Sequence, residues 1–247
     1  EYERVKEFHQ RVKELLQKQK ETVFTATAQE LQREAAAIYP LLEEYITLVQ
    51  RFEEIYLTQK IEMNVYDFDK TIYAGDSTID FYLFCLKRQP AILRCLPMQI
   101  KGLIQYKQKR IDKTAMKEQF YSFLKGLHNV EQLLCEFWDL HEKKMQAWYI
   151  EQQAEDDVVI SASPAFLLGE ICDRKKIRYL IASEVDMHTG ICLGQNCRGE
   201  EKVKRFYERF GTGVTVNRFY SDSRSDQPMA ELASQAYLVK GNKIKEW

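Results

Sequence analysis

The chain of 247 residues is long enough for one large domain or for a core with a small cap, and its composition is typical of a globular α/β protein. Its 36 Lys and Arg nearly balance its 37 Asp and Glu, and with a formal net charge of −1 we expect no nucleic-acid partner. No apolar run reaches the length of a transmembrane helix, no signal-peptide pattern opens the chain, and the six cysteines show no disulfide framework, so we expect a cytoplasmic location.

Residues 1–60 are predicted to form a helical hairpin. They contain no glycine, and apolar residues recur at helical spacing in two segments. Thr27 and Glu30 match a capping box, which would start the second helix. Each helix needs an apolar partner, so the two could pack on one another, on the rest of the chain, or on a second subunit in a homodimer.

Two carboxylates follow the first predicted strand at the point where it should end. An apolar run ends at Tyr66, and Asp67 and Asp69 come directly after it. Because side chains alternate along a strand, both carboxylates share a face and can converge on one small volume. Two anions so close need a cation, a shared proton or a reaction that uses them, whereas a solvated turn is the alternative.

Residues 77–156 are predicted to form helices that are rich in aromatic side chains, as the interior of a small cap would be. Within this segment, residues 86–126 carry ten Lys and Arg against two acids, with apolar residues between the charges. Such a stretch can lie on an anionic membrane surface or gather a phosphorylated substrate. A packed helix with a solvated basic face is the alternative.

Three later segments supply further polar groups beside strand or helix ends. A run of branched apolar residues, typical of a buried parallel strand, ends at the hydroxyl of Ser161 and the small residue Ala162. Lys202 stands in the first turn of a predicted helix, and a third strand runs into a polar turn with Asp222 and Asp226. Ligands bind at the carboxyl ends of strands in open α/β sheets, and this set of acids, hydroxyl and cation can hold a divalent metal and a phosphate together.

In this order, the four segments resemble the signature motifs of the haloacid dehalogenase superfamily, whose phosphatase branch carries DxDxT, a Ser or Thr, a Lys and an acidic pair. The matching residues are Asp67-Phe68-Asp69-Lys70-Thr71, Ser161, Lys202 and Ser221-Asp222-Ser223-Arg224-Ser225-Asp226. The resemblance is strongest to phosphoserine phosphatase-like members (subfamily IB) with a helical C1-type cap, because residues 74–80 resemble their acidic cap-entry segment. Lys70 departs from the pattern, since many relatives carry a small residue there.

The resemblance implies an α/β fold with a three-layer, Rossmann-like core and a parallel sheet. It covers about residues 61–247 and divides them into a catalytic core, residues 61–76 and 157–247, and an inserted helical cap, residues 77–156. The predicted hairpin of residues 1–60 lies outside the resemblance, and its role is not assigned.

The resemblance also implies a role for each matching residue. Asp67 would attack phosphorus as a nucleophile, and Asp69 would be the general acid and base, with a pKa raised by the nearby Asp67. Mg²⁺ would be held by Asp67, by the main-chain carbonyl of Asp69 and by Asp222, because this cation prefers oxygen ligands. The phosphate-binding residues would be Ser161, Ala162 and Thr71, with Lys202 as a catalytic cation and with Asp226 and Asp76 in support.

The function implied is magnesium-dependent hydrolysis of a phosphomonoester through an aspartyl-phosphate, with a small phosphometabolite such as phosphoserine as the substrate. The second acid, Asp69, favours phosphoryl transfer over dehalogenation, because a halide leaves without a proton. Three alternatives stay open: a lipid-phosphate phosphatase similar to phosphatidylglycerophosphatase C, transfer of the phosphoryl group to a second substrate, and a non-catalytic module that binds a partner.

Overall fold

The computed structural model describes residues 10–11, 13–14, 39–51 and 62–247. The chain divides into two compact units, Glu1–Lys60 and Ile61–Trp247. In the first unit residues 39–51 are helical, whereas Thr27, Glu30 and most of the predicted hairpin lie outside the described residues. The hairpin and the homodimer through it therefore stay predictions. Within the described ranges, no helix combines the length and the apolar character needed to cross a membrane.

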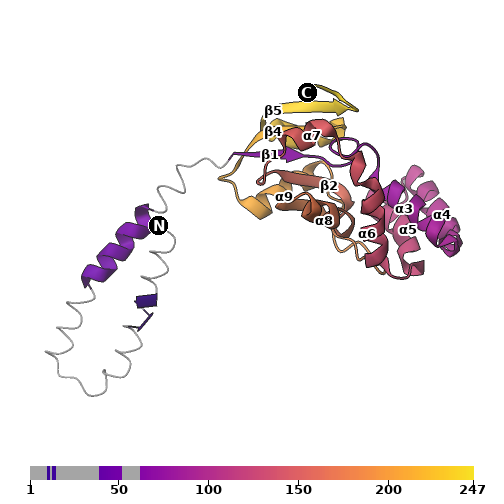
Figure 1. The fold of residues 1–247 in the computed structure, drawn as a ribbon, viewed down its shortest axis with the longest axis horizontal. Helices are drawn as coiled ribbons and strands as arrows, with labels where there is room; N and C mark the ends of the chain where they lie inside the picture. The colour runs from indigo at the N-terminus through magenta and orange to yellow at the C-terminus, as the bar shows by residue number, and fades with distance from the viewer. Residues whose placement is uncertain (1–9, 12, 15–38, 52–61) are drawn as a thin grey trace, which may run out of the picture. The chain divides into compact units, whose positions relative to one another are not determined.

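The second unit is built on a six-stranded sheet with the strand order β3-β2-β1-β4-β5-β6 (Figure 1). The first five strands are parallel, and β6 pairs antiparallel with β5. The predicted α/β fold with a parallel sheet is thus confirmed, and β6 adds an edge strand. The strands are β1 (Glu62–Tyr66), β2 (Val158–Pro164), β3 (Tyr179–Ser183), β4 (Thr215–Ser221), β5 (Ala233–Lys240) and β6 (Lys243–Glu246).

Helices cover both faces of this sheet and give the core its three layers. Alternate residues of the central strands point to opposite faces, so that Val65 and Val159 lie in separate apolar clusters. One cluster packs under α9 (Glu200–Phe210) and α10 (Gln227–Leu232), and the other under α8 (Ala165–Arg174). The continuous apolar run in β2 is explained by this burial on both faces.

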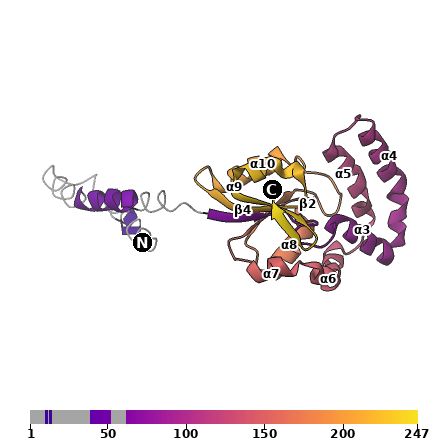
Figure 2. The same ribbon diagram turned by 90° about the horizontal axis from the view of Figure 1, so that it is seen from above.

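The segment between β1 and β2 is built of helices, as predicted. Figure 2 shows α4 and α5 projecting beyond the sheet, with α3 leading from β1 toward them. The elements are α3 (Ser77–Arg88), η1 (Pro90–Cys95), α4 (Leu96–Lys107), α5 (Lys113–Tyr121), η2 (Ser122–Gly126), α6 (Val130–His141), η3 (Glu142–Lys144) and α7 (Ala147–Gln152).

The helices α6 and α7 pack on the core rather than projecting from it, α6 against α8 and α7 against β1. Trp138 of α6 is fully buried, and its Nε1 donates to the carbonyl of Leu167 in α8 at 2.8 Å. The ring of Tyr149 in α7 lies 4.9 Å from that of Tyr66 in β1, edge to face. The predicted cap of residues 77–156 therefore encloses two parts: the projecting helices α4 and α5, and the helices α6 and α7 that complete one layer of the core.

Candidate active site

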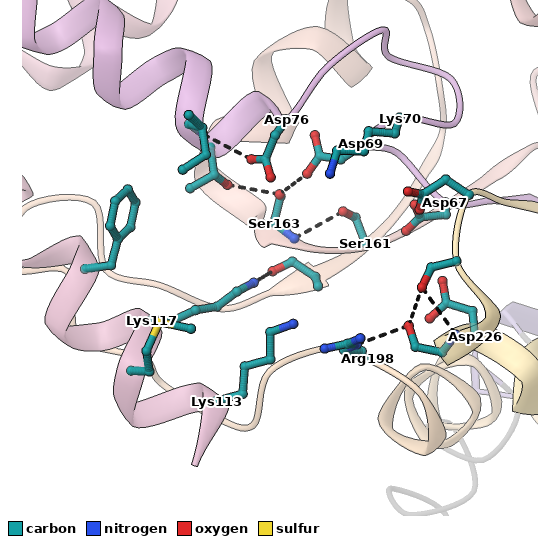
Figure 3. A pocket seen from close by; sticks show the side chains of 18 of the residues that line it. Asp67, Asp69, Lys70, Asp76, Lys113, Lys117, Ser161, Ser163, Arg198 and Asp226 are labelled. Carbon is teal, nitrogen blue, oxygen red and sulfur yellow. Dashed lines mark hydrogen bonds between the residues drawn. The ribbon is translucent and has the colours of Figure 1, made fainter. Parts of the chain in front are cut away.

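A cavity of about 440 Å³ lies at the carboxyl ends of β1, β2 and β4, beneath α5 (Figure 3). The parallel sheet brings the four predicted motifs to this one edge, because each follows or ends a neighbouring strand or begins α9. Of the predicted site residues, all but Thr71 line the cavity: Asp67, Asp69, Asp76, Ser161, Ala162, Lys202, Asp222 and Asp226.

Asp67 is held from three sides. Its main-chain N–H donates to the carbonyl of Tyr220 at 2.8 Å, which ties it to β4. Lys202 Nζ donates to Oδ1 at 2.6 Å, and Thr71 Oγ1 donates to Oδ2 at 3.3 Å. Thr71 is fully buried behind Asp67 and outside the cavity lining, so its hydroxyl supports the carboxylate rather than facing a phosphoryl group.

Two carboxylates share the buried ammonium of Lys202. Asp226 Oδ2 accepts from Lys202 Nζ at 2.8 Å and from the hydroxyl of Ser221 at 2.8 Å. Burial lowers the pKa of Lys202, but the two carboxylates raise it by more, so the pKa lies above its ordinary value and the side chain stays charged. Burial raises the pKa of Asp67 to about 7 against the opposing attraction of Lys202. The cluster has one cation for two buried acids, so a further cation would stabilise it.

Asp69 faces away from Asp67 and toward the start of α3. Its Oδ1 accepts from the main-chain N–H of Ser77 at 2.7 Å, and its Oδ2 accepts a short hydrogen bond from the hydroxyl of Ser163. The pKa of Asp69 is raised mainly by burial and next by the charge of Asp76. The predicted direction of this shift agrees with the structure, but burial and Asp76 are its largest causes rather than Asp67, although the charges of Asp67 and Asp69 also interact.

The end of β2 supplies hydroxyl and main-chain groups. Ser161 is 1% exposed at the cavity wall, and its Oγ accepts from the main-chain N–H of Ser163 at 3.1 Å. The carbonyl of Ala162 accepts from Lys117 Nζ at 2.6 Å and from the hydroxyl of Ser183 at 3.0 Å. Asp76 caps α3 by accepting from the N–H of Ile79 at 3.1 Å, so the cap-entry acid also fixes where this helix begins.

Several cavity residues were not predicted as site residues from the sequence, among them the polar residues Ser163, Lys113, Lys117 and Arg198. The hydroxyl of Ser163 links Asp69 to Thr78 Oγ1, which lies 3.0 Å away. Lys113 and Lys117 stand one turn apart on α5, and this i, i+4 spacing was the signal that both face the same way. That they face the cavity depends on how α5 packs over the sheet, which no local pattern reveals.

Three cavity cations lie apart from the cluster of Lys202: Lys113 and Lys117 beneath α5, and Arg198, whose Nε donates to Ser225 Oγ at 3.1 Å (Figure 3). Lys113, Lys117 and Arg198 form no ion pair with any acid in the part of the chain that the structure describes. Burial lowers the pKa of Lys117 to about 8, and burial together with the neighbouring Arg198 lowers that of Lys113. Acids and Lys202 therefore line the sheet end, two unpaired lysines line the end beneath α5, and Arg198 lies between them.

The donor set at the sheet end fits a hard divalent cation. Burial raises the pKa of Asp222, and this acid forms no ion pair within the described ranges. No group of three or more His, Cys, Asp or Glu side chains there forms a metal cluster. The predicted ligands of Mg²⁺ are only two carboxylates, Asp67 and Asp222, and the main-chain carbonyl of Asp69. Such a small set is sufficient because Mg²⁺ commonly retains several waters.

The fold and the cavity define an α/β protein with an acidic pocket at the carboxyl edge of its sheet. Residues 65–231 match the family model described as haloacid dehalogenase-like hydrolase. The chain therefore belongs to the haloacid dehalogenase-like hydrolase family and is an enzyme of the hydrolase class. The predicted family is confirmed.

Two solved structures share this fold. A protein of unknown function from Bordetella pertussis Tohama I is 22% identical, with a TM-score of 0.59, over 72% of this chain and 89% of its own. A probable phosphoserine phosphatase from Vibrio cholerae is 12% identical, with a TM-score of 0.51, over 72% of this chain and 57% of its own. No curated protein matches the chain. At these identities the likeness establishes the fold alone.

Proposed function

We propose that this hydrolase is a phosphatase that cleaves phosphomonoesters through an aspartyl-phosphate on Asp67. The observation that carries the proposal is the geometry of Asp67, a buried carboxylate oriented by Lys202 and Thr71 at the base of an open cavity. A carboxylate used only for structure needs no access to a cavity. A nucleophile needs both a fixed direction and a space in which the reacting phosphorus can lie.

In the first step, a carboxylate oxygen of Asp67 forms a bond to phosphorus while the bond from phosphorus to the alcohol oxygen breaks. Asp69 gives its proton to that leaving oxygen, and its raised pKa supports the protonated form that this transfer needs. In the second step water attacks phosphorus, Asp69 takes the proton of that water, and the bond from phosphorus to Asp67 breaks. Inorganic phosphate and free Asp67 result.

Lys202 and Ser161 have supporting roles in both steps. The ammonium of Lys202 neutralises charge as it spreads over the phosphoryl oxygens, and the hydroxyl of Ser161 can donate to one of them. Asp226 keeps Lys202 in place through the contact at 2.8 Å. Mg²⁺ held by Asp67, Asp222 and the main-chain carbonyl of Asp69 would supply further positive charge to the phosphoryl oxygens.

The three unpaired cations, Lys113 and Lys117 beneath α5 and Arg198 beside them, support a substrate whose leaving group carries a second negative charge. Phosphoserine has a carboxylate in this part of the molecule, and a lipid phosphate of the phosphatidylglycerophosphate type has a phosphodiester. The apolar lining residues Leu103, Met116 and Phe120 favour a leaving group with an apolar portion as well. Phosphoserine stays the first candidate and the lipid phosphate the second, and transfer of the phosphoryl group to another acceptor shares the first step.

The experiment is the release of phosphate from phenyl phosphate by the full chain, with Mg²⁺ and with a chelator. Asp67→Asn should abolish turnover, because a neutral amide cannot form the acyl phosphate. The matched control Asp173→Asn, an exposed acid of α8, should retain wild-type turnover. Full activity of Asp67→Asn would contradict the mechanism. A wild-type chain that binds phosphate but turns over no phosphomonoester would favour a non-catalytic module.

A further inference from the structure

In the helix α4 a polar and a small residue face the rest of the protein, and several apolar side chains are exposed. Its two buried residues are Gln99 and Gly102. Gln99 Nε2 donates to the carbonyl of Phe120 at 2.9 Å, and a Cβ added at Gly102 would lie 2.9 Å from Gln119 Cβ, so this polar and small face is the one that packs on α5. The apolar side chains of the helix are left outward.

A set of exposed apolar side chains of η1 and α4 is here called the α4 face, in which Leu96, Ile100 and Ile104 follow one another at intervals of four residues. Its members are 41% to 52% exposed, as large apolar side chains rarely are when they stand together: Leu93, Leu96, Met98, Ile100 and Ile104. A solvated helix of a cap would place charged or polar groups at these positions. The predicted alternative, a packed helix with a solvated basic face, accounts for the exposed lysines of α4 but not for its exposed apolar side chains.

The charges within the segment that forms the α4 face have a single sign. Residues 81–111 contain no Asp or Glu, and they carry seven basic residues: Lys87, Arg88, Arg94, Lys101, Lys107, Lys109 and Arg110. Each of these side chains is exposed. An apolar surface whose own segment carries basic and no acidic residues is complementary to a bilayer surface with anionic headgroups, where the apolar side chains enter the interface and the basic ones meet phosphates.

We propose that the α4 face docks peripherally on an anionic lipid bilayer. The helix has 12 residues, and two lysines lie within it, so it would lie in the plane of the interface. Leu103, the neighbour of the α4 face, is 48% exposed and lines the active-site cavity, so the docked surface borders the cavity. The proposal does not depend on the reaction, because none of the side chains that form the α4 face belongs to the catalytic set.

The test is cosedimentation of the full chain with large vesicles of phosphatidylcholine that contain 40% phosphatidylglycerol, and with vesicles of phosphatidylcholine alone. We expect binding to the anionic vesicles that falls at least tenfold between 0.05 M and 0.5 M NaCl, since salt screens the attraction. We expect no comparable binding to the neutral vesicles. Absence of binding to anionic vesicles at low salt would overturn the proposal.

Two variants separate the apolar part of the binding from the basic part. Ile100→Gln with Ile104→Gln keeps the charge and should lower the partition coefficient about tenfold or more. The matched control, Leu140→Gln with Ile150→Gln, alters equally exposed side chains on α6 and α7 and should bind as the wild type does. Lys101, Lys107 and Lys109 changed together to Gln should lower binding to anionic vesicles about a hundredfold. Lys204, Lys240 and Lys243 changed to Gln are the control for charge.

Sedimentation velocity of the same proteins, without lipid, tests whether a second copy of the chain covers the α4 face instead of a bilayer. A wild-type chain that self-associates, and that becomes monomeric only when Ile100 and Ile104 are changed, would assign the surface to a second copy and overturn the lipid proposal. Circular dichroism shows that each variant is folded. Because Ile100 and Ile104 are about half exposed, we expect unfolding temperatures close to that of the wild type.

Discussion

Asp222 and Ser161 illustrate how neighbouring cavity residues differ in role. Asp222 is a proposed ligand of Mg²⁺, whereas Ser161 faces the phosphoryl group. Asp222→Ala should raise the half-saturating Mg²⁺ concentration about tenfold or more, and Ser161→Ala should change it less than about twofold while lowering kcat/KM. Magnesium titrations of both variants with phenyl phosphate measure this difference. Equal titration curves would contradict the assignment of the two roles.

The cations at the cap end predict a preference that a matched pair of substrates can measure. Phenyl phosphate and 4-carboxyphenyl phosphate differ by one carboxylate. If Lys113 and Arg198 bind a second anion, Lys113→Met and Arg198→Met should lower kcat/KM for the carboxylated ester about tenfold more than for phenyl phosphate, because each removes a charge-assisted hydrogen bond. Lys204→Met on α9 is the control and should alter neither value.

The two esters differ in the acidity of their leaving groups. This difference cancels when the kcat/KM of each variant is divided by that of the wild type on the same ester. Equal losses on both esters would place Lys113 and Arg198 at the transferred phosphoryl group instead. A wild-type chain inactive on both esters would count against the proposed phosphatase activity and not against the position of the cations.

At the residue scale, the sequence was informative where chemistry depends on local order. Asp67, Asp69 and Lys202 were predicted to meet because each stands beside a strand end or a helix start, and parallel strands deliver such positions to one edge. The direction of the Asp69 side chain was not predictable, because it depends on a hydroxyl 94 residues away, that of Ser163.

At the scale of elements, α6 is part of the core through Trp138. This side chain packs on Phe68 and Tyr73 from the first motif and donates to Leu167, so it connects the inserted segment to the catalytic loop. Trp138→Phe should lower the free energy of unfolding by about 2 kcal/mol, through lost volume and a lost buried hydrogen bond. Urea denaturation measures it.

Trp148→Phe in α7 is the matched control for that change. The Nε1 of Trp148 is buried without a hydrogen-bond acceptor among the residues the structure describes, so its removal relieves an unsatisfied donor. We expect a loss of less than about 1 kcal/mol. A Trp138→Phe variant as stable as Trp148→Phe would show that α6 is loosely attached, as a projecting cap helix would be.

The buried acid Asp157, directly before β2, predicts that the stability of the fold depends on pH. Asp157 is fully buried, its Oδ2 accepts from the N–H of Ala154 at 2.9 Å, and burial raises its pKa to about 6. Since this lies above the unfolded value of about 3.9, the folded state binds more protons between these values, and the contribution of Asp157 to stability is lost as pH rises from about 4 through 6.

Asp157→Asn should therefore stabilise the fold at pH 7.5 by about 1 kcal/mol, a value reduced by solvent screening, and should be nearly neutral at pH 4. Thermal unfolding at both pH values measures the effect, with the exposed neighbour Asp156→Asn as the control. A gain that is equal at both pH values would show that the charge of Asp157 is not its cause.

Element types followed from periodicity more readily than their packing did. The apolar run of β2 marked a buried strand, since continuous apolar runs are typical of parallel strands covered on both faces. The sequence did not predict that α4 projects while α6 packs on the core, because both are apolar helices in an aromatic segment. Only tertiary contacts distinguish Trp138, which is buried under α8, from Ile100, which is left outward.

At the scale of the whole molecule, the second unit combines an acidic sheet edge, a cationic cap end and an apolar α4 face. The cavity lies between the first two, so a phosphorylated substrate meets the nucleophile at one end and unpaired cations at the other. This arrangement depends on the insertion of α3 to α7 after β1, because the insertion carries α5 over the carboxyl edge of the sheet. Deleting residues 89–126 should leave the sheet edge and Arg198 in place but remove Lys113 and Lys117, two of the three cations proposed to select the leaving group.

The central claim is that Asp67 becomes covalently phosphorylated during turnover. The measurement is an acid quench of the full chain within one turnover of phenyl phosphate, followed by peptide mass spectrometry. We predict a gain of one phosphoryl group on Asp67, in the tryptic peptide of residues 61–70, that is absent from Asp67→Asn and disappears as phosphate is released. Rapid turnover with no phosphoryl group on that peptide at any time, or with the group on another residue, would contradict the account.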